Sequence, residues 1–406
     1  MAEQIYDVLI IGAGPAGLTC AIKLAESGLH IAIIDQSSFP KDKTCGDGLS
    51  LDSINQLPMV SATLNESFER FEHKIPSYGI KVTSDKGDVF TIPHYYKGVK
   101  KCGYVCKRID FDKLLFEELK RHSHIQFIPD CKVLDAKVTD DLAEITTTKG
   151  MMNAKIIVGS DGANSVIARK LHNRKLDKDS SIIGLRRYYK EVYGFHEDHY
   201  IEMYFFKELL PGYLWIFPLP NNQANVGLGI ISSIASKKKI NLKETLDNLL
   251  KTHPVLKDRF QNAQPLETVK GALLPVAMKK QKISGTRYIL TGDAAGLTDP
   301  LSGEGIANAM RSGRVAAEHL LNCFRHDNFT ETFNEQYDKE IYRRMWNEFR
   351  VSKLFLRVFH NPRLLNFLIN KISKKPELQT FIIECVANPN QLKKLISIRF
   401  IWKILC

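Results

Sequence analysis

The sequence predicts an α/β fold class with α+β character: a Rossmann-like domain with an interleaved antiparallel β domain and a C-terminal helical segment. Three observations predict this class. An apolar strand, a glycine-rich turn and a helix open the chain at residues 5–28. Strand-like alternation fills residues 180–274, and strand–turn–helix units lie on both sides of it. One domain built from separate segments, with a second domain threaded between them, accounts for this order.

The domain boundaries follow from where these segments begin and end. We predict a Rossmann-like domain at 1–75, 103–178 and 272–330, a β domain at 76–102 and 179–271, and a helical, basic region at 331–406. The chain has 406 residues, of which 44% are hydrophobic and 25% charged, which is typical of globular proteins. No apolar run reaches the roughly 20 residues that a membrane-spanning helix needs.

The first residues and the cysteines indicate the compartment. The first residues, "MAEQIYDVLIIGAG", lack the basic region of a secretory signal. Eight scattered cysteines match neither a disulfide framework nor a zinc pattern. We therefore expect a cytoplasmic protein with reduced thiols and no metal site.

The first strand and helix are joined by "GAGPAG", which is the context of a dinucleotide fingerprint. Gly12 permits the tight turn, Gly14 lets a pyrophosphate approach the backbone, and Gly17 lets the helix pack closely on the strand. The helix starts at Pro15 and Ala16, where free N–H groups and a partial positive charge favour phosphates.

An acidic residue follows at the expected distance. Asp35 ends the second strand, "HIAIIDQ", about 20 residues after the glycines, where a carboxylate hydrogen-bonds ribose hydroxyls. With strand, helix and acid in register, an ordinary glycine-rich turn is the weaker interpretation.

A second block, "LTGDAAGLTDPLSGEGIANAM", combines a strand end, a tight loop and a helix start. Asp293 is placed to accept hydrogen bonds from polyol hydroxyls. The helix dipole behind the loop favours negative charge, such as that of a reduced flavin near N1. A capped core helix would explain the helix but not "GDAAG". The candidate residues in this block are Gly292, Asp293, Pro300, Gly303, Gly305 and Ile306.

These two blocks, together with "VGSDGANS" around Asp161 and Gly162, resemble the three FAD fingerprints of the aromatic-hydroxylase-like flavoproteins over most of residues 1–320. The resemblance implies FAD as the cofactor, Arg108 of "CKRIDFDKLL" near its pyrophosphate, and Val133 among its contacts. Only the first block has the glycine fingerprint, so the sequence predicts no separate nicotinamide-binding domain. The electron donor is therefore expected to be NAD(P)H bound transiently or a ferredoxin-like protein.

Two further stretches resemble the geranylgeranyl reductase family. They are "KDKTCGDGLS" at 41–50 and "PGYLWIFPLPNNQANVGLG" at 211–229. The "CGDGL" form is most similar to bacterial members that reduce a double bond in the isoprenoid tail of menaquinone. The resemblance implies hydride transfer from reduced FAD to alkenes of a geranylgeranyl or menaquinone chain, with Cys45 and Gly46 beside the flavin.

The aromatic spacing suits such a substrate. Tyr213, Trp215 and Phe217 occupy alternate positions of a predicted strand and would share one face. A polyprenyl chain offers only methyls and π-bonds, and rigid aromatics form a wall for it at low entropic cost. Gly227 and Gly229 would leave room for the substrate on the neighbouring strand. An aromatic core patch under a loop is the alternative interpretation.

The role of Cys45 is open at this stage. Hydride addition to an alkene requires a proton on the other carbon, and a thiol near its usual pKa could supply it. Equally, Cys45 could pack against the ring while water supplies the proton. Asp47 stands where many relatives have glycine, and its role is open too.

Two other functions use the same features. A flavin-dependent monooxygenase or halogenase would share the scaffold, but the halogenase relatives carry Trp-x-Trp-x-Ile-Pro where this chain reads "YLWIFP". A non-catalytic FAD-binding scaffold of a membrane complex is the third interpretation.

The basic tail suggests a membrane surface. The formal net charge is +12, and residues 351–406 hold ten Lys/Arg against two Asp/Glu. The segments "VSKLFLRVFHNPRLLNFLINKISKK" and "QLKKLISIRFIWKIL" mix apolar helical spacing with basic residues, as interfacial helices do. We predict peripheral contact with the inner face of the cell membrane and no nucleic-acid binding. A helical bundle that caps the domain is the alternative.

Overall fold

The computed structural model describes residues 5–96, 98–175, 177–387 and 394. Predictions that concern the second tail segment, 391–405, therefore lie outside the described residues, Lys394 apart. The helices are α1 (Pro15–Leu24), α2 (Leu51–Val60), α3 (Ala62–Arg70), α4 (Arg108–Lys120), α5 (Val166–Leu171), α6 (Ser232–Lys237), α7 (Leu242–Thr252), α8 (Gly292–Ala295), α9 (Ile306–Arg325), α10 (Glu331–Phe359), α11 (Pro362–Lys374) and α12 (Pro376–Ala387).

The strands form two large sheets and two small ones. They are β1 (Ile5–Ile11), β2 (Ile31–Ile34), β3 (Gly48–Leu49), β4 (Ile75–Ser77), β5 (Gly79–Ser84), β6 (Val89–Pro93), β7 (Tyr95–Tyr96), β8 (Val99–Lys100), β9 (Gly103–Val105), β10 (Gln126–Ile128), β11 (Val133–Val138), β12 (Ala143–Thr147), β13 (Gly150–Gly159), β14 (Ser181–Lys190), β15 (Ile201–Phe205), β16 (Tyr213–Leu219), β17 (Gln223–Ile231), β18 (Gln264–Pro265), β19 (Lys270–Pro275), β20 (Ser284–Gly285) and β21 (Tyr288–Leu290).

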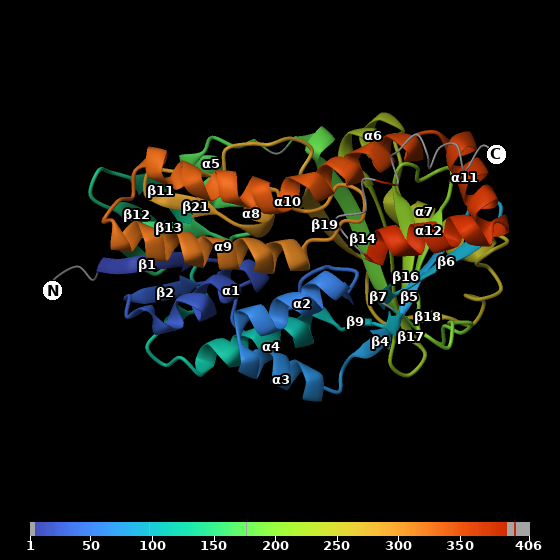
Figure 1. Cartoon of the computed structure of the whole chain (residues 1–406), viewed down its shortest axis with the longest axis horizontal. Helices are drawn as coiled ribbons and strands as arrows, with labels where there is room; N and C mark the ends of the chain where they lie inside the picture. Colours follow the sequence, from blue (N-terminus) through green and yellow to red (C-terminus); the bar gives the residue numbers. More distant parts are fainter. Residues whose placement is uncertain (1–4, 97, 176, 388–393, 395–406) are drawn as a thin grey trace.

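The first sheet is a parallel core with an antiparallel extension, and it forms the half of the molecule that holds the N-terminus (Figure 1). Its order is β10-β2-β1-β13-β12-β11, with β21 pairing β13. Strands β10, β2, β1, β13 and β21 run parallel, so their carboxyl ends meet at one edge. Helices α1 and α9 pack closely, because a Cβ at Gly313 would overlap the backbone oxygen of Ala16.

The second sheet is mostly antiparallel, in the order β18-β14-β17-β16-β15-β5-β6, with β19 pairing β14. Its strands come from residues 79–93 and 181–275, on either side of α4 and β10–β13 in the sequence. One face buries an apolar core that includes Leu214 and Ile216 of β16 with Leu246 and Leu249 of α7. The other face carries the aromatic residues of β16. The exact domain boundaries given above stay a prediction.

Several elements agree with the sequence and some do not. The opening βαβ unit and the neighbouring strands β16 and β17 are confirmed. Helices α2, α3, α6 and α7 were not predicted. The helix α7 carries Leu242, Leu246, Leu249 and Leu250 at helical spacing. This spacing is missed when strands are predicted throughout residues 180–274 from the alternation that precedes it.

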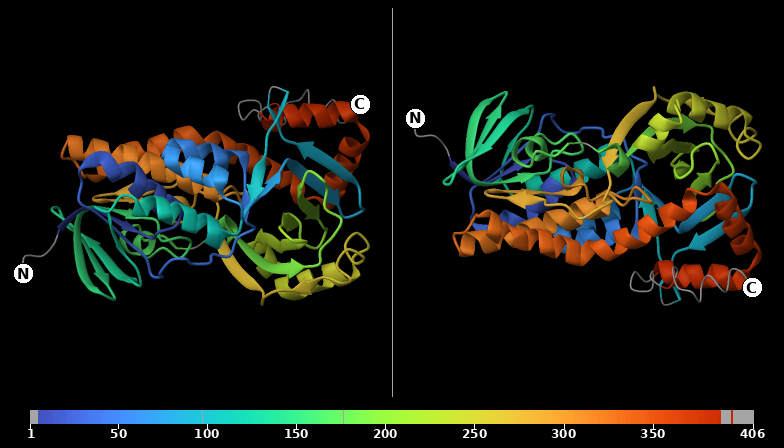
Figure 2. Two further views of the ribbon diagram at one scale, coloured as in Figure 1. Left: turned by 90° about the horizontal axis from the view of Figure 1, so that it is seen from below. Right: turned by 90° about the horizontal axis from the view of Figure 1, so that it is seen from above.

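The C-terminal helices link the two halves. Figure 2 shows α10 running from the first sheet toward the second, where α11 and α12 follow. Leu365, Ile369 and Ile372 of α11 pack with Val82 and Phe90 of the sheet. The inner face of α11 therefore caps the second sheet. Among the described residues, no helix is both long and apolar enough to cross a membrane.

Candidate active site

The three fingerprint motifs meet at the carboxyl edge of the first sheet. Gly12 follows β1 in a left-handed conformation (φ 103°), and a Cβ there would overlap the backbone oxygen of Ser160 after β13. The Ser160 and Thr291 hydroxyls lie 2.7 Å apart. Gly292 lies over Ala16 of α1, where a Cβ would stand 3.4 Å from the alanine methyl.

This edge has the features that an FAD pyrophosphate and ribityl chain would need. A Cβ at Gly14 would meet nothing within 4 Å, and no side chain caps the α1 N-terminus that begins at Pro15. Asp161 caps α5 through Oδ2, which accepts from the Val166 N–H at 2.6 Å. Its Oδ1 is buried and has no hydrogen-bond partner. An open backbone, free N–H groups and an orphaned carboxylate oxygen fit the cofactor.

Two predicted carboxylates are paired with lysines of the 41–50 loop. Asp35 accepts from the Ala13 N–H at 2.7 Å and also pairs with Lys41. Asp293 accepts from Lys43 Nζ at 2.9 Å and from the Thr298 hydroxyl at 3.0 Å. Burial opposes ionisation of Asp293, but these two donors hold its pKa below the usual value. The loop that carries Cys45 is thereby tied to both carboxylates.

Arg108 is paired within its own helix. It is buried at the start of α4, and its guanidinium forms two hydrogen bonds to Asp112, at 2.9 and 2.7 Å. Its charge also acts on Cys45. The guanidinium is therefore committed to Asp112 and the thiol, and a contact with the FAD pyrophosphate stays a prediction. Val133, at the start of β11, is a buried core residue.

The loop before α9 supplies part of its own helix cap. Pro300 is buried, Gly303 is left-handed (φ 71°), and Gly305 precedes Ile306, the first residue of α9. Glu304 Oε1, however, accepts from the Ala307 N–H at 3.1 Å. One N–H group of this helix N-terminus is therefore bound by the chain's own carboxyl, whose pKa burial raises.

The aromatic residues of β16 form a continuous row, here called the aromatic row: Tyr213, Trp215 and Phe217. The ring centroids of neighbours are 6.2 and 6.3 Å apart. The Tyr213 hydroxyl donates to the backbone oxygen of Ser302 in the loop before α9. The row therefore runs from the third FAD fingerprint toward the segment around Cys45.

The glycines of β17 have a different use from the one predicted. Cross-strand pairing places Trp215 opposite Gly227, and a Cβ at Gly227 would overlap the indole. A Cβ at Gly229 or Gly184 would also touch the ring, at 3.8 and 3.9 Å. These glycines make room for the indole, which lies flat across β17 toward β14. The expectation that Gly227 leaves space for substrate is wrong, because Trp215 fills that space.

The segment from Cys45 to Gly48 packs against the row. A Cβ at Gly46 or Gly48 would stand 3.1 Å from the Phe217 ring, and Gly46 also approaches the indole nitrogen of Trp215. A side chain at either glycine would displace the aromatics, so the backbone itself lies beside the row.

Asn225 joins this segment to the row. Its Oδ1 accepts from the Trp215 indole N–H at 2.9 Å, and its Nδ2 donates to the Cys45 carbonyl at 2.7 Å. The same Nδ2 donates to Asp47 Oδ2 at 2.8 Å, which also accepts from the Tyr188 hydroxyl at 2.7 Å. The backbone N–H of Arg108 donates to Asp47 Oδ1 at 3.1 Å.

Burial raises the pKa of two acidic groups in this segment, the Cys45 thiol and the Asp47 carboxyl. It raises the pKa of the half-buried Cys45 thiol, against the charge of Arg108, so the thiol keeps its proton at neutral pH. Burial also raises the pKa of Asp47 to about 6, against the lowering effect of the hydrogen bonds from Asn225 and Tyr188. Asp47 is fully buried, so its ionisation is costly.

Asp47 should make the stability of the fold depend on pH. In an unfolded chain its carboxyl titrates near 4, so between about pH 4 and pH 6 the folded state binds the proton more tightly. The free energy of unfolding should therefore fall across this range as pH rises, by up to about 3 kcal/mol from this group. Asp47→Asn should lose this component, which urea denaturation at several pH values would measure. Parallel curves for the two proteins would contradict the assignment.

The fold and this site define the class of protein: an FAD-dependent oxidoreductase with the fold of the aromatic hydroxylases. A model of the FAD binding domain family matches residues 5–350. The chain is 30% identical over 352 residues to digeranylgeranylglycerophospholipid reductase of Methanosarcina acetivorans, a match that covers 83% of this chain and 80% of that protein. It is 28% identical over 329 residues to menaquinone reductase of Mycobacterium tuberculosis, with 78% and 77% covered.

Solved structures show the same fold. A geranylgeranyl bacteriochlorophyll reductase-like protein from Thermoplasma acidophilum superposes with a TM-score of 0.80 at 23% identity, over 97% of this chain and 99% of that one. A mutant halogenase in complex with FAD gives a TM-score of 0.74 at 18% identity, over 97% of this chain and 83% of that one. The chain belongs to the geranylgeranyl reductase family, which confirms the predicted family, fold class and cofactor.

Sequence reasoning did not assign three residues of the site: Asp47, Tyr188 and Asn225. Asn225 is part of the Asn-x-Gly-x-Gly element, but only its glycines were taken as candidates. Cross-strand register would have pointed to it, since Asn225 pairs with Phe217 on one side and Tyr188 on the other. Tyr188 carries no motif and could be found only from the folded sheet.

Proposed function

We propose that this FAD-dependent oxidoreductase saturates carbon–carbon double bonds of an isoprenoid chain, such as a geranylgeranyl group or a menaquinone side chain. The observation that carries the proposal is the aromatic row, which runs from the third FAD fingerprint at Ser302 to the Cys45–Gly48 segment. Rigid rings beside the cofactor edge suit a substrate that offers only methyls and π-bonds. The names of the relatives support the same substrate class.

In this proposal, different residues of the chain bind the substrate, exclude water and supply the proton. Bound and reduced, FAD supplies the hydride. The aromatic row holds the prenyl chain and excludes water from the alkene. The Cys45 thiol, protonated at neutral pH, holds a proton for the second carbon of the double bond. After proton transfer, the Arg108 guanidinium beside the sulfur would stabilise the thiolate.

Anaerobic turnover tests this function against its rivals. The FAD-loaded protein is reduced with dithionite and mixed with menaquinone or a geranylgeranyl lipid, and the products are weighed by mass spectrometry. We expect products that gain two hydrogens per reduced alkene. An oxygenated product that forms only with oxygen would favour a monooxygenase or halogenase, and bound flavin without any turnover would favour a scaffold. With NADPH or reduced ferredoxin in place of dithionite, the same assay identifies the donor.

The outer face of α11 is our proposed contact with the inner face of the membrane. Leu364 and Phe367 are each 41% exposed on the side opposite the sheet. Arg363, Lys371 and Lys374 lie on the same helix, which carries no acidic residue, and Lys371 Nζ lies 5.7 Å from the Phe367 ring centroid. Exposed apolar groups with basic neighbours favour an anionic lipid surface.

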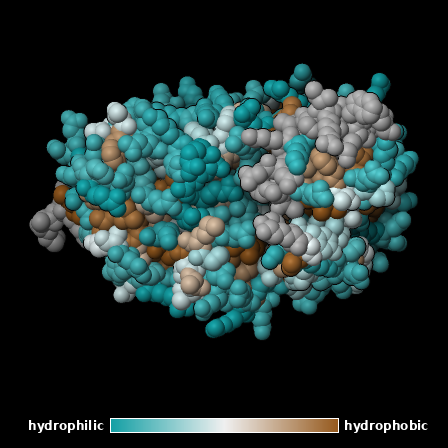
Figure 3. Space-filling model, in the orientation of Figure 1, coloured by the Kyte–Doolittle hydropathy of each residue, from teal (hydrophilic) through white to brown (hydrophobic). Residues whose placement is uncertain are grey.

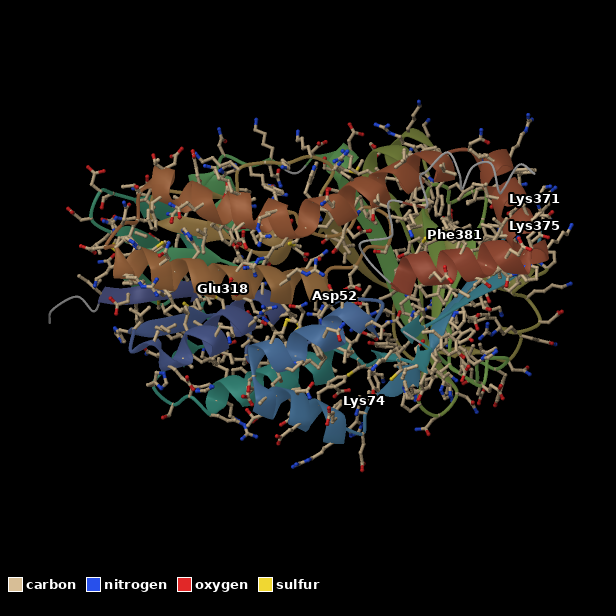
Figure 4. All side chains as sticks on the ribbon, viewed as in Figure 1. Asp52, Lys74, Glu318, Lys371, Lys375 and Phe381 are labelled. Atoms are coloured by element: carbon tan, nitrogen blue, oxygen red, sulfur yellow. The ribbon has the colours of Figure 1, made fainter. Side chains whose placement is uncertain are left out.

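Binding to lipid vesicles would test whether the outer face of α11 contacts a membrane. In Figure 3 most of the visible surface is hydrophilic. Figure 4 labels Lys371 on α11 and Lys375 just beyond it, at the end of the molecule away from the N-terminus. We expect the protein to sediment with vesicles that contain phosphatidylglycerol and to stay in solution with pure phosphatidylcholine. Equal partition with both would argue against a charge-assisted contact.

A further inference from the structure

The amide of Asn225 has only one orientation that satisfies its neighbours. Its Oδ1 faces the indole N–H of Trp215, and its two N–H bonds point to the Cys45 carbonyl and to Asp47 Oδ2. Rotated by half a turn, the amide would place its N–H groups against the indole N–H and its oxygen against two acceptors. Asp47 is thus the acceptor that helps to fix the amide.

Asp47 keeps this position in a backbone conformation that favours glycine. Its φ is 66°, in the left-handed region, which glycine adopts without strain and aspartate only tolerates. Its side chain is fully buried and accepts from Asn225, Tyr188 and the Arg108 backbone. The carboxyl group therefore contributes something that glycine at the same backbone position would lack.

Asn225 and Asp47 connect the aromatic row to the backbone of Cys45. Asn225 bonds the Trp215 indole at one end and the Cys45 carbonyl at the other, while Asp47 lies two residues after Cys45 and bonds the same amide. Tyr188, which lies beside Asn225 on the neighbouring strand β14, also donates to Asp47. A shift of the Cys45 backbone would break hydrogen bonds on both strands.

We propose that Asp47 is a positioning residue: together with Asn225 it holds the Cys45 backbone against the aromatic row and so sets the place of the thiol relative to a bound chain. The inference rests on the proposed function for the reaction it serves, but the network itself does not depend on the substrate. In the absence of the carboxyl, one N–H of Asn225 and the Tyr188 hydroxyl lose their buried acceptor, and the Cys45 carbonyl is held less firmly.

The test compares Asp47→Asn, Asp47→Gly and Asn225→Leu in the full-length, FAD-loaded protein. Asparagine keeps an acceptor for Asn225 and Tyr188 but faces the Arg108 N–H with a donor, whereas glycine keeps only the backbone. We expect kcat to fall in the order wild type, Asn, Gly, by about tenfold for glycine, the factor that one buried hydrogen bond to a charged group represents. KM should stay within about twofold, because the aromatic row itself is retained.

A second readout needs no substrate. The rate at which iodoacetamide alkylates Cys45, followed on its peptide by mass spectrometry, should rise about tenfold in Asp47→Gly and in Asn225→Leu. Removal of the Asp47 charge alone would also lower the thiol pKa, but Asn225→Leu retains that charge. Tyr204→Phe is the matched control, because it removes a buried tyrosine–carboxylate bond, to Glu202 at 2.5 Å, outside the site.

The outcomes separate the positioning role from its alternatives. If glycine at 47 is as active as wild type, with unchanged alkylation, backbone conformation alone matters and the proposal is overturned. If alkylation rises with Asp47→Gly but not with Asn225→Leu, the effect is electrostatic, and the proposal is again overturned. If wild type reduces no prenyl lipid while alkylation follows the expected pattern, the proposed function fails and the positioning role stands.

Discussion

Gly17→Ala should yield a protein that is strongly destabilised and holds little FAD. A Cβ at Gly17 would overlap the backbone oxygen of Gly12, and the Ile10 side chain stands at 3.2 Å. Neither the tight turn nor strand β1 can shift without disrupting the other fingerprint loops. Overpacking of this kind costs about 3 kcal/mol or more, because the obstacle is backbone and not a flexible side chain.

Gly14→Ala is the matched variant with the opposite signature. Gly14 has φ −88°, which alanine adopts freely, and its Cβ would meet nothing within 4 Å. The protein should therefore fold with an unchanged Tm. The added methyl would occupy the space predicted for the pyrophosphate, at a cost of about 1–3 kcal/mol, which weakens FAD binding roughly ten- to a hundredfold.

Thermal unfolding of the FAD-free proteins and titration with FAD distinguish the two variants. The expected pattern is a lower Tm for Gly17→Ala alone, with FAD affinity reduced in both. If Gly14→Ala bound FAD as tightly as wild type, the pyrophosphate would not lie over this residue, and the orientation of the cofactor at the strand edge would have to be revised.

The contrast between these glycines shows what a sequence can predict. The fingerprint around Gly12 has a meaning that depends only on local order, strand then turn then helix, and the structure places it accordingly. Asp161 and Asp293 also follow two neighbouring parallel strands of one sheet, so their convergence follows from topology once the strands are identified. Fold class, cofactor and family were therefore within reach of the residues alone.

The side-chain contacts inside the site could not be predicted from the sequence. Arg108 can point to a cofactor phosphate or to Asp112, which lies four residues later on α4. The sequence is compatible with both arrangements. The use of Gly227 depends on which way the Trp215 side chain turns, since an empty position and a position filled by a neighbour look the same in a sequence. The network of Asp47, Asn225 and Tyr188 needs the register of three strands.

Trp215→Leu and Leu214→Ala should separate catalysis from stability on a single strand. Trp215 faces the Cys45–Gly48 segment, whereas Leu214 is fully buried in the core against α7. Leu214→Ala should cost about 2–5 kcal/mol of stability, as large-to-small core substitutions do. Trp215→Leu keeps an apolar side chain but removes the flat ring and the donor to Asn225 Oδ1, so prenyl reduction should fall on the order of a hundredfold through misplacement of the chain.

The measurement that decides is turnover per molecule of bound FAD, with the free energy of unfolding determined in parallel. Leu214→Ala should retain near-normal turnover in the fraction that holds FAD, because Leu214 packs in the core that β16 shares with α7 and not in the aromatic row. Trp215→Leu should retain FAD and reduction by dithionite, yet lose the prenyl reaction. If both variants lost turnover in proportion to stability, the aromatic row would be a packing element, and the substrate would have to bind elsewhere along the flavin.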